Sequence, residues 1–129
     1  MLKVFSKKKN GNEKLTEHFK VKEFACKDGT DVIFIETDLA EVLEKIRNHF
    51  NKAVHITSGY RTVAHNIKCG GAIFSQHCYG MAVDIYIKGV PPKEIALYAQ
   101  TLLPDTGGIG LYPSFVHIDV RETKSRWNK

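Results

Sequence analysis

An α+β fold, with a largely antiparallel sheet flanked by helices, is the class that this sequence predicts. Two stretches place apolar residues at helical spacing, and several shorter ones alternate apolar with polar side chains. Most of the alternating stretches follow one another through turn residues, which favours antiparallel pairing. A chain of 129 residues can bury a core without disulfides or a structural metal. We therefore expect a single domain over residues 1–129, in which residues 1–14 form a loose N-terminal segment.

Residues 14–50 are expected to lead through a short strand into the first helix. Residues 14–29 look like a short helix or turn followed by a docking segment, with apolar anchors at Phe19, Val21 and Phe24. The stretch TDVIFIET, residues 30–37, has the composition of a strand. Asp38 then begins a helix, because Asp38 and Glu41 form a pair like a capping box. Apolar residues follow at helical spacing, at Leu39, Val42, Leu43, Ile46 and Phe50.

The second half of the chain is expected to supply most of the sheet. A strand that turns at Ser58–Gly59 is predicted within residues 53–62. Further strands are predicted at residues 81–89, 107–112 and 114–121, and helices at residues 64–68 and 92–103. Glycines end the first of these helices and prolines open the second. Side chains alternate along residues 81–89, with one face formed by Val83, Ile85 and Ile87 and the other by Ala82, Asp84 and Tyr86.

Polar side chains interrupt two of these predicted strands and suggest a metal site on one face of the sheet. Asp84 lies within one strand, His117 and Asp119 share a face of another, and His77 lies in the turn before Asp84. Neighbouring strands about 4.8 Å apart can bring Asp84 and His117 onto one ion. Zinc binds histidine nitrogen and carboxylate oxygen, and catalytic zinc sites use three protein ligands and leave one position for water. His77, Asp84 and His117 are therefore the candidate zinc ligands; the alternative is structural histidines and a solvated aspartate.

The stretches SGYRT, SQHCYGMAVDI and GGIGLYPSFVHIDVR, with the closing RW, resemble the M15 peptidases, and the resemblance extends from Leu15 to Trp127. This group contains zinc D-Ala-D-Ala carboxypeptidases and related peptidoglycan peptidases, and the chain is most similar to the small versions found in phage and prophage lysis modules. The group's SxHxxGxAxD motif is matched by Ser75, His77, Gly80, Ala82 and Asp84. The resemblance implies an α+β peptidase whose Zn²⁺ is held by His77, Asp84 and His117.

The resemblance also assigns roles to residues around the metal. It implies that Arg61 of SGYRT holds a carboxylate of the substrate or polarises the scissile carbonyl, which a rigid, permanently charged fork does better than lysine. The alternative is that Arg61 is a surface turn residue. Tyr60, Ser75 and Gln76 are expected to shape the substrate site or orient ligands, and a purely structural role is the alternative for each.

One position departs from the family pattern. Several M15 members carry a glutamate or aspartate three residues before the last zinc-binding histidine, where it acts as general base, but this chain has Ser114 there. Asp119, two residues after His117 and on the same strand face, is the expected substitute. The alternative is that Asp119 orients a ligand or Arg121.

These observations predict a zinc metallopeptidase that cleaves an amide bond in peptidoglycan stem peptides or cross-bridges. Whether it is a carboxypeptidase or an endopeptidase of the endolysin type stays open. A non-catalytic, zinc-bearing module that binds cell-wall material or a protein is the alternative, because Ser114 replaces the usual acid. The net charge of +5 suits an anionic partner, but no nucleic-acid-binding motif accompanies it, so we expect no nucleic-acid partner.

The sequence contains no apolar run long enough to span a bilayer and no recognisable secretion signal. We therefore expect no membrane insertion, a cytoplasmic monomer as synthesised, and action on the cell wall after release. The three cysteines, Cys26, Cys69 and Cys78, are expected to be reduced, because an odd number without a CxxC pair is untypical of a disulfide framework. Cys78 follows His77, but neighbouring side chains of an extended segment point in opposite directions.

Overall fold

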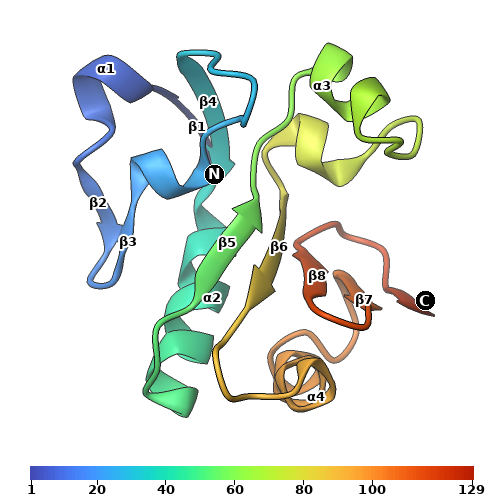
Figure 1. Cartoon of the computed structure of the whole chain (residues 1–129). Helices are drawn as coiled ribbons and strands as arrows, with labels where there is room; N and C mark the ends of the chain where they lie inside the picture. Colours follow the sequence, from blue (N-terminus) through green and yellow to red (C-terminus); the bar gives the residue numbers. More distant parts are fainter.

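A five-stranded sheet forms the centre of the computed structural model, which describes residues 1–129 (Figure 1). Its strands lie in the order β5 (His55–Ser58), β6 (Ala82–Tyr86), β8 (Val116–Asp119), β7 (Gly108–Leu111) and β9 (Ser125–Asn128). All neighbours pair antiparallel except β7 and β9, which are parallel. The predicted α+β class with a largely antiparallel sheet is therefore confirmed.

Helices α2 (Thr37–Phe50) and α4 (Pro92–Leu102) share one hydrophobic core with the sheet. Alternation along β6 and β8 sends one set of side chains into this core, because β-strand residues point to opposite faces in turn. Val83 pairs with Ile118 and Ile85 with Val116, and all four are fully buried. The intervening pair, Asp84 and His117, points to the other face. The core thus fixes the register that places these two polar side chains side by side.

The N-terminal residues form two small sheets and are part of the fold. Strand β1 (Leu2–Ser6) pairs antiparallel with β4 (Val32–Glu36), and β2 (Lys14–Thr16) pairs with β3 (Phe19–Lys20). A short helix, α1 (Lys7–Asn10), follows β1, and Ser6 Oγ caps it by accepting from the backbone N–H of Lys9. The prediction of a loose segment over residues 1–14 is therefore wrong. Leu2 and Val4 stay largely exposed, so β1 is held by backbone pairing with a distant strand, which leaves little hydrophobic signal in the sequence.

Helix α2 begins one residue earlier than predicted and without the predicted capping box. Glu36 is its N-cap, and no side chain makes a cap hydrogen bond. Strand β4 runs directly into the helix, and the backbone N–H of Thr37 donates to the carbonyl of Met1, the residue before β1. The backbone of Met1 thus satisfies the N–H of the first helical residue, one of the donors that have no partner within a helix.

Three short helical elements complete the fold. The 3₁₀ helix η1 (Val21–Phe24) lies in the predicted docking segment, α3 (Val63–Lys68) matches the predicted short helix, and η2 (Gln76–Tyr79) occupies the turn before β6. Strand β5 is shorter than the predicted stretch, and β9 was not predicted. No helix in the chain combines the length and apolar character that a membrane crossing requires.

Candidate metal centre

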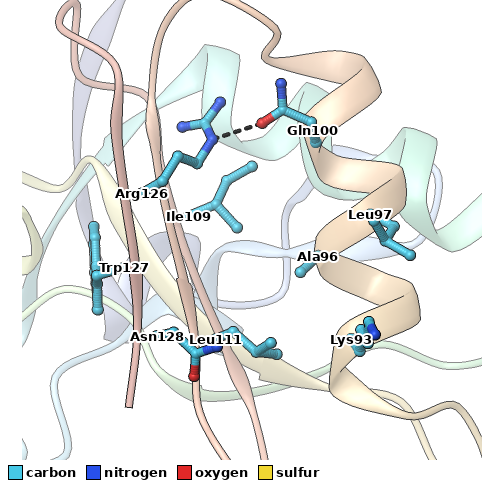
Figure 2. Close-up of a pocket in the computed structure, with 9 residues that line it drawn as sticks. All are labelled: Lys93, Ala96, Leu97, Gln100, Ile109, Leu111, Arg126, Trp127 and Asn128. Carbon is cyan, nitrogen blue, oxygen red and sulfur yellow. Dashed lines mark hydrogen bonds between the residues drawn. The ribbon is translucent and has the colours of Figure 1, made fainter.

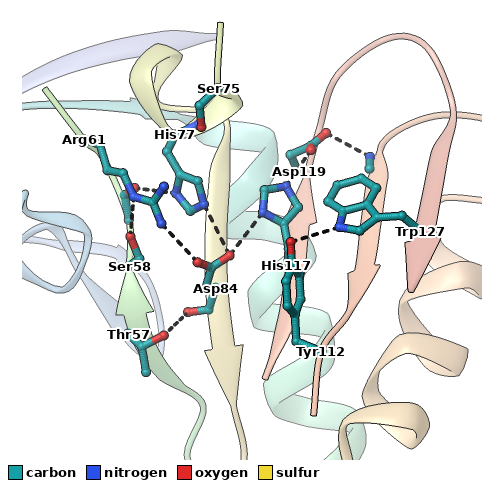
Figure 3. Close-up of polar contacts among 12 residues, drawn as sticks. Thr57, Ser58, Arg61, Ser75, His77, Asp84, Tyr112, His117, Asp119 and Trp127 are labelled. Carbon is teal, nitrogen blue, oxygen red and sulfur yellow. Dashed lines mark hydrogen bonds and ion pairs between the residues drawn. The ribbon is translucent and has the colours of Figure 1, made fainter. Parts of the chain in front are cut away.

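Three buried polar side chains converge on the open face of the sheet. His77 comes from η2, Asp84 from the middle of β6 and His117 from β8 (Figure 3). Asp84 Oδ1 lies 3.3 Å from His77 Nε2 and 3.1 Å from His117 Nδ1. One ligand atom from each residue lies within 4.8 Å of the others, and each side chain is buried. The predicted ligand residues are therefore brought together at one point.

Local structure places His77 against the sheet. Ser75 is the N-cap of η2, and its Oγ accepts a hydrogen bond from the His77 backbone N–H. Gly80 ends η2 with φ of +71°, in the left-handed region that favours glycine. A Cβ at Gly80 would also clash with the backbone carbonyl of Phe34. The chain can therefore turn directly from the histidine into the strand that carries Asp84.

Hydrogen bonds on the outer side of each ring determine which nitrogen faces Asp84. His77 Nδ1 lies 2.8 Å from the carbonyl oxygen of Gly59, which can only accept, so Nδ1 carries the proton and Nε2 offers a lone pair. His117 Nε2 lies 2.7 Å from Asp119 Oδ2 and is the donor in that pair. His117 Nδ1 then faces Asp84. Such outer hydrogen bonds are what orients metal-binding histidines.

The electrostatics of the cluster favour a cation among these atoms. Burial would raise the pKa of Asp84, but the contacts with His117 and His77 outweigh it and hold this pKa below its usual range. Burial would likewise lower the pKa of His117, but Asp119 and Asp84 together raise it. A metal ion can replace the proton between His117 and Asp84. Two imidazole nitrogens and one carboxylate oxygen are the donor set of a catalytic zinc site, so the residues fit Zn²⁺.

Arg61 lies beside the outer oxygen of Asp84. Its Nη2 is 3.3 Å from Asp84 Oδ2, its Nε donates to Ser58 Oγ at 2.9 Å, and its Nη1 donates to Asn66 Oδ1 at 3.2 Å. Asn66 is itself buried and donates to the carbonyl of Ala72. The guanidinium is thus held in one orientation at the metal centre and is not a free surface turn residue.

Asp119 is fully buried and hydrogen-bonded through both oxygens. Its Oδ1 accepts from the backbone N–H groups of Gly108 and Arg121 and from Arg121 Nε, at 2.8, 3.2 and 2.9 Å. Its Oδ2 accepts from His117 Nε2 and, at 2.6 Å, from Arg121 Nη2. Burial would raise the pKa of Asp119, but His117 and Arg121 hold it below its usual range. This environment favours the alternative in which Asp119 orients His117 over the expected role as general base.

The other predicted site residues divide into two groups. Ser75 and Gln76 line the cavity above the metal centre. Tyr60 does not: it is 9% exposed, its ring packs on Phe34 with centroids 5.3 Å apart, and its backbone N–H donates to Phe24. The structural alternative for Tyr60 is therefore the one that its surroundings support.

A cavity of about 820 Å³ opens onto the three ligands. One wall is the segment of residues 69–76, which includes the exposed side chains of Ile73 and Phe74. The other wall contains Tyr112, Phe115, Arg121 and Trp127, and Arg61 lies at its base beside Asp84. The cavity therefore gives an extended substrate access to the metal centre.

Trp127 is a site residue to which the sequence reasoning gave no role. Its ring lies 5.0 Å from that of His117, its Nε1 donates to Tyr112 Oη at 3.1 Å, and Arg121 stacks on it at 5.6 Å. A Cβ at Gly110 would clash with the Trp127 ring, so this glycine is what lets the indole lie across β7. The closing RW was part of the family resemblance, and it was the signal from which a role for Trp127 in the site could have been inferred.

A second hollow lies on the α4 side of strands β7 and β9 (Figure 2). Its volume is about 460 Å³, and Arg126 bonds to Gln100 across it at 2.6 Å. Its lining contains no histidine, cysteine, aspartate or glutamate. Of these two cavities, only the larger is lined by side chains of the kinds that usually bind metals.

Comparisons with known proteins agree with this geometry. The model of the family described as peptidase M15 matches residues 16–119. The chain is 37% identical over 75 residues to the peptidoglycan L,D-endopeptidase MepK of Escherichia coli strain K12, covering 53% of this chain and 40% of that protein. It is 34% identical over 76 residues to the probable peptidoglycan L,D-endopeptidase MepK of Haemophilus influenzae, covering 54% and 40%. The matched region thus spans less than half the length of these relatives.

Proposed function

Because this chain belongs to the peptidase M15 family, we propose that it is a zinc-dependent peptidase that hydrolyses an amide bond in peptidoglycan stem peptides or cross-bridges. The observation that carries the proposal is the convergence of His77, Asp84 and His117 beneath a cavity of about 820 Å³. The names of the curated relatives support peptidoglycan as the substrate and favour the L,D-endopeptidase type over the carboxypeptidase type.

Each ligand atom follows from the hydrogen bonds around it. We assign Zn²⁺ binding to His77 Nε2, His117 Nδ1 and Asp84 Oδ1, since Gly59 and Asp119 occupy the opposite ring nitrogens. Zinc bound there supplies a Lewis acid that polarises a carbonyl and lowers the pKa of water to about 7. Asp119 holds His117 in the tautomer that keeps Nδ1 free.

Arg61 is the residue to which we assign recognition of the substrate. The guanidinium has five N–H donors. Three of them, one each on Nε, Nη1 and Nη2, already make hydrogen bonds within the chain, so one donor stays free on Nη1 and one on Nη2. These two donors can meet a carboxylate or the scissile carbonyl oxygen. Because the guanidinium is already fixed, it loses little conformational freedom when substrate binds. Donors placed in advance stabilise developing negative charge most effectively.

We propose that residues 1–129 act as one peptidase domain and as a monomer, with cell-wall material as its partner. The net charge of +5 suits an anionic polymer. Ser75 and Gln76 line the cavity and are proposed to contact the substrate.

A non-catalytic module that binds wall material is the second candidate function. Ser114 in place of an acid and the buried, fully bonded Asp119 favour it, because neither residue can serve as an obvious base.

Turnover of purified peptidoglycan separates the two functions. An enzyme releases soluble peptide-containing fragments, loses this activity on chelation and regains it when Zn²⁺ is returned. A binding module sediments with the peptidoglycan before and after zinc loading and releases no fragments, and that result would reject the peptidase.

A further inference from the structure

A second group of metal-type donors lies outside the centre described above. Cys26 and Asp28 follow η1, and His65 comes from α3. One ligand atom from each lies within 4.8 Å of the other two. The two donor segments are separated in sequence by β4, α2 and β5, so tertiary folding brings them together. All three cysteines of the chain are free, which leaves the thiol of Cys26 available.

The surrounding hydrogen bonds hold Asp28 in place, and one of them comes from the Cys26 thiol. Asp28 Oδ1 accepts from the Thr30 backbone N–H at 2.9 Å, and Oδ2 accepts from Thr62 Oγ1 at 2.8 Å. The Thr30 hydroxyl and the Cys26 thiol also donate to this carboxylate, which has about four lone-pair positions, so a metal ion would take the position of the Cys26 thiol proton. Thr62 Oγ1 also accepts from the His65 backbone N–H as the N-cap of α3. The same contacts thus fix Asp28 and the start of the helix that carries His65.

A nucleophilic role for this Cys–His–Asp group does not fit its exposure. Cys26 is 3% exposed, so a substrate cannot reach its sulfur, whereas a small ion can approach through Asp28, which is exposed, and His65, which is half-buried. A thiolate, an imidazole and a carboxylate together are a donor set that zinc binds well. Cys69 places a further sulfur 3.3 Å from His65 Nε2.

We propose that Cys26, Asp28 and His65 form a second site for zinc, distinct from the His77, Asp84 and His117 centre. Binding there releases the thiol proton to solvent and links the loop after η1 to the start of α3. The segment between the two sites is bonded on both sides: Tyr60 N–H donates to Phe24, and Arg61 N–H donates to His77. A metal ion bound at this second site would therefore stabilise the position of the segment that carries Arg61.

Cobalt titration of the full chain tests this site separately from the first. Co²⁺ bound by a thiolate gives a charge-transfer absorption in the near ultraviolet, and the first site offers only nitrogen and oxygen. We expect this absorption in the wild-type chain and in an Asp84→Asn variant. It should disappear in Cys26→Ser, and in His65→Gln the Co²⁺ affinity should fall at least about tenfold. Cys78→Ala, a matched thiol control beside His77, should keep the absorption.

Zinc content provides the second readout. The wild-type chain should retain one more equivalent of Zn²⁺ than Cys26→Ser after gel filtration, with circular dichroism confirming that the variant is folded. The half-buried His65→Gln variant keeps the test decisive if Cys26→Ser does not fold. A wild-type chain without the absorption, an absorption that survives Cys26→Ser, or an unchanged Co²⁺ affinity at this site in His65→Gln overturns the proposal. Both the cobalt absorption and the zinc content measure metal binding alone, so their outcome does not depend on whether the chain is a peptidase.

Discussion

Replacing Asp119 by asparagine keeps the shape of the side chain but exchanges one acceptor for an NH₂ donor. Two donors face Oδ2, from His117 and Arg121, and three face Oδ1, from Gly108 and twice from Arg121. Whichever way the amide lies, its NH₂ meets at least two of them. A buried donor without an acceptor costs about 1–3 kcal/mol, so the fold should lose roughly 2–6 kcal/mol if the surroundings do not rearrange.

His117 can relieve this conflict by changing tautomer, and that change reaches the metal. If the asparagine NH₂ donates to Nε2, the ring proton moves to Nδ1, the atom that faces Asp84. Nδ1 then has no lone pair for zinc. Loss of such an orienting partner lowers metal affinity by about 10–100-fold, which corresponds to about 1.4–2.7 kcal/mol.

Competition with a chromophoric chelator measures this effect directly, with Asp105→Asn, an exposed acid, as the matched control. We expect weaker zinc binding in Asp119→Asn and no change in Asp105→Asn, and ¹⁵N shifts of the His117 ring should report the new tautomer. If Asp119→Asn binds zinc as tightly as the wild type but no longer turns over substrate, Asp119 is the general base and the orienting role is refuted. Unchanged zinc affinity with unimpaired turnover refutes both roles.

Three further changes test other parts of the account. Arg61→Ala should lower kcat by about 10²–10³-fold, as expected for a lost donor to developing charge, while zinc content stays the same; full activity would exclude Arg61 from catalysis. Gly110→Ala should lower the free energy of unfolding by about 1–3 kcal/mol, because its Cβ displaces the Trp127 ring, and an unchanged Tm and indole fluorescence would contradict this. Burial would raise the pKa of Glu44, but hydrogen bonds, including those from His18, lower it to about 2. Because the folded pKa is the lower one, this stabilisation is present above pH 4.5 and is lost as the pH falls towards 2. Glu44→Gln should therefore unfold more easily than the wild type above pH 4.5, with the difference shrinking below it, and a difference independent of pH would show that the charge has no role.

The sequence predicted the polar face of the sheet because strand periodicity is a local property. Alternation alone separates Val83 and Ile85 from Asp84, and the structure confirms that Asp84 and His117 are register partners. Strands β1 and β9 were missed because their stability comes from backbone pairing with distant segments, which leaves no clear hydrophobic pattern in five or four residues.

The surroundings of Asp119 could not be predicted from the sequence for a related reason. Its spacing from His117 shows that the two share a face, but not that Gly108 and the fork of Arg121 occupy its oxygens. Those contacts depend on the register of β7 against β8 and on a side-chain conformation. The Cys26, Asp28 and His65 cluster is likewise set by tertiary folding, since no motif spacing connects its two segments.

Digestion of defined muropeptides by the zinc-loaded chain, read by mass spectrometry, tests the central claim most directly. We expect the wild type to cut an amide bond between an L- and a D-centre, and we expect folded His77→Ala, Asp84→Ala and His117→Ala variants neither to retain zinc at this centre nor to release product. Full activity in any one of these three variants, or no cleavage of any muropeptide by a folded, zinc-loaded wild-type chain, would contradict it.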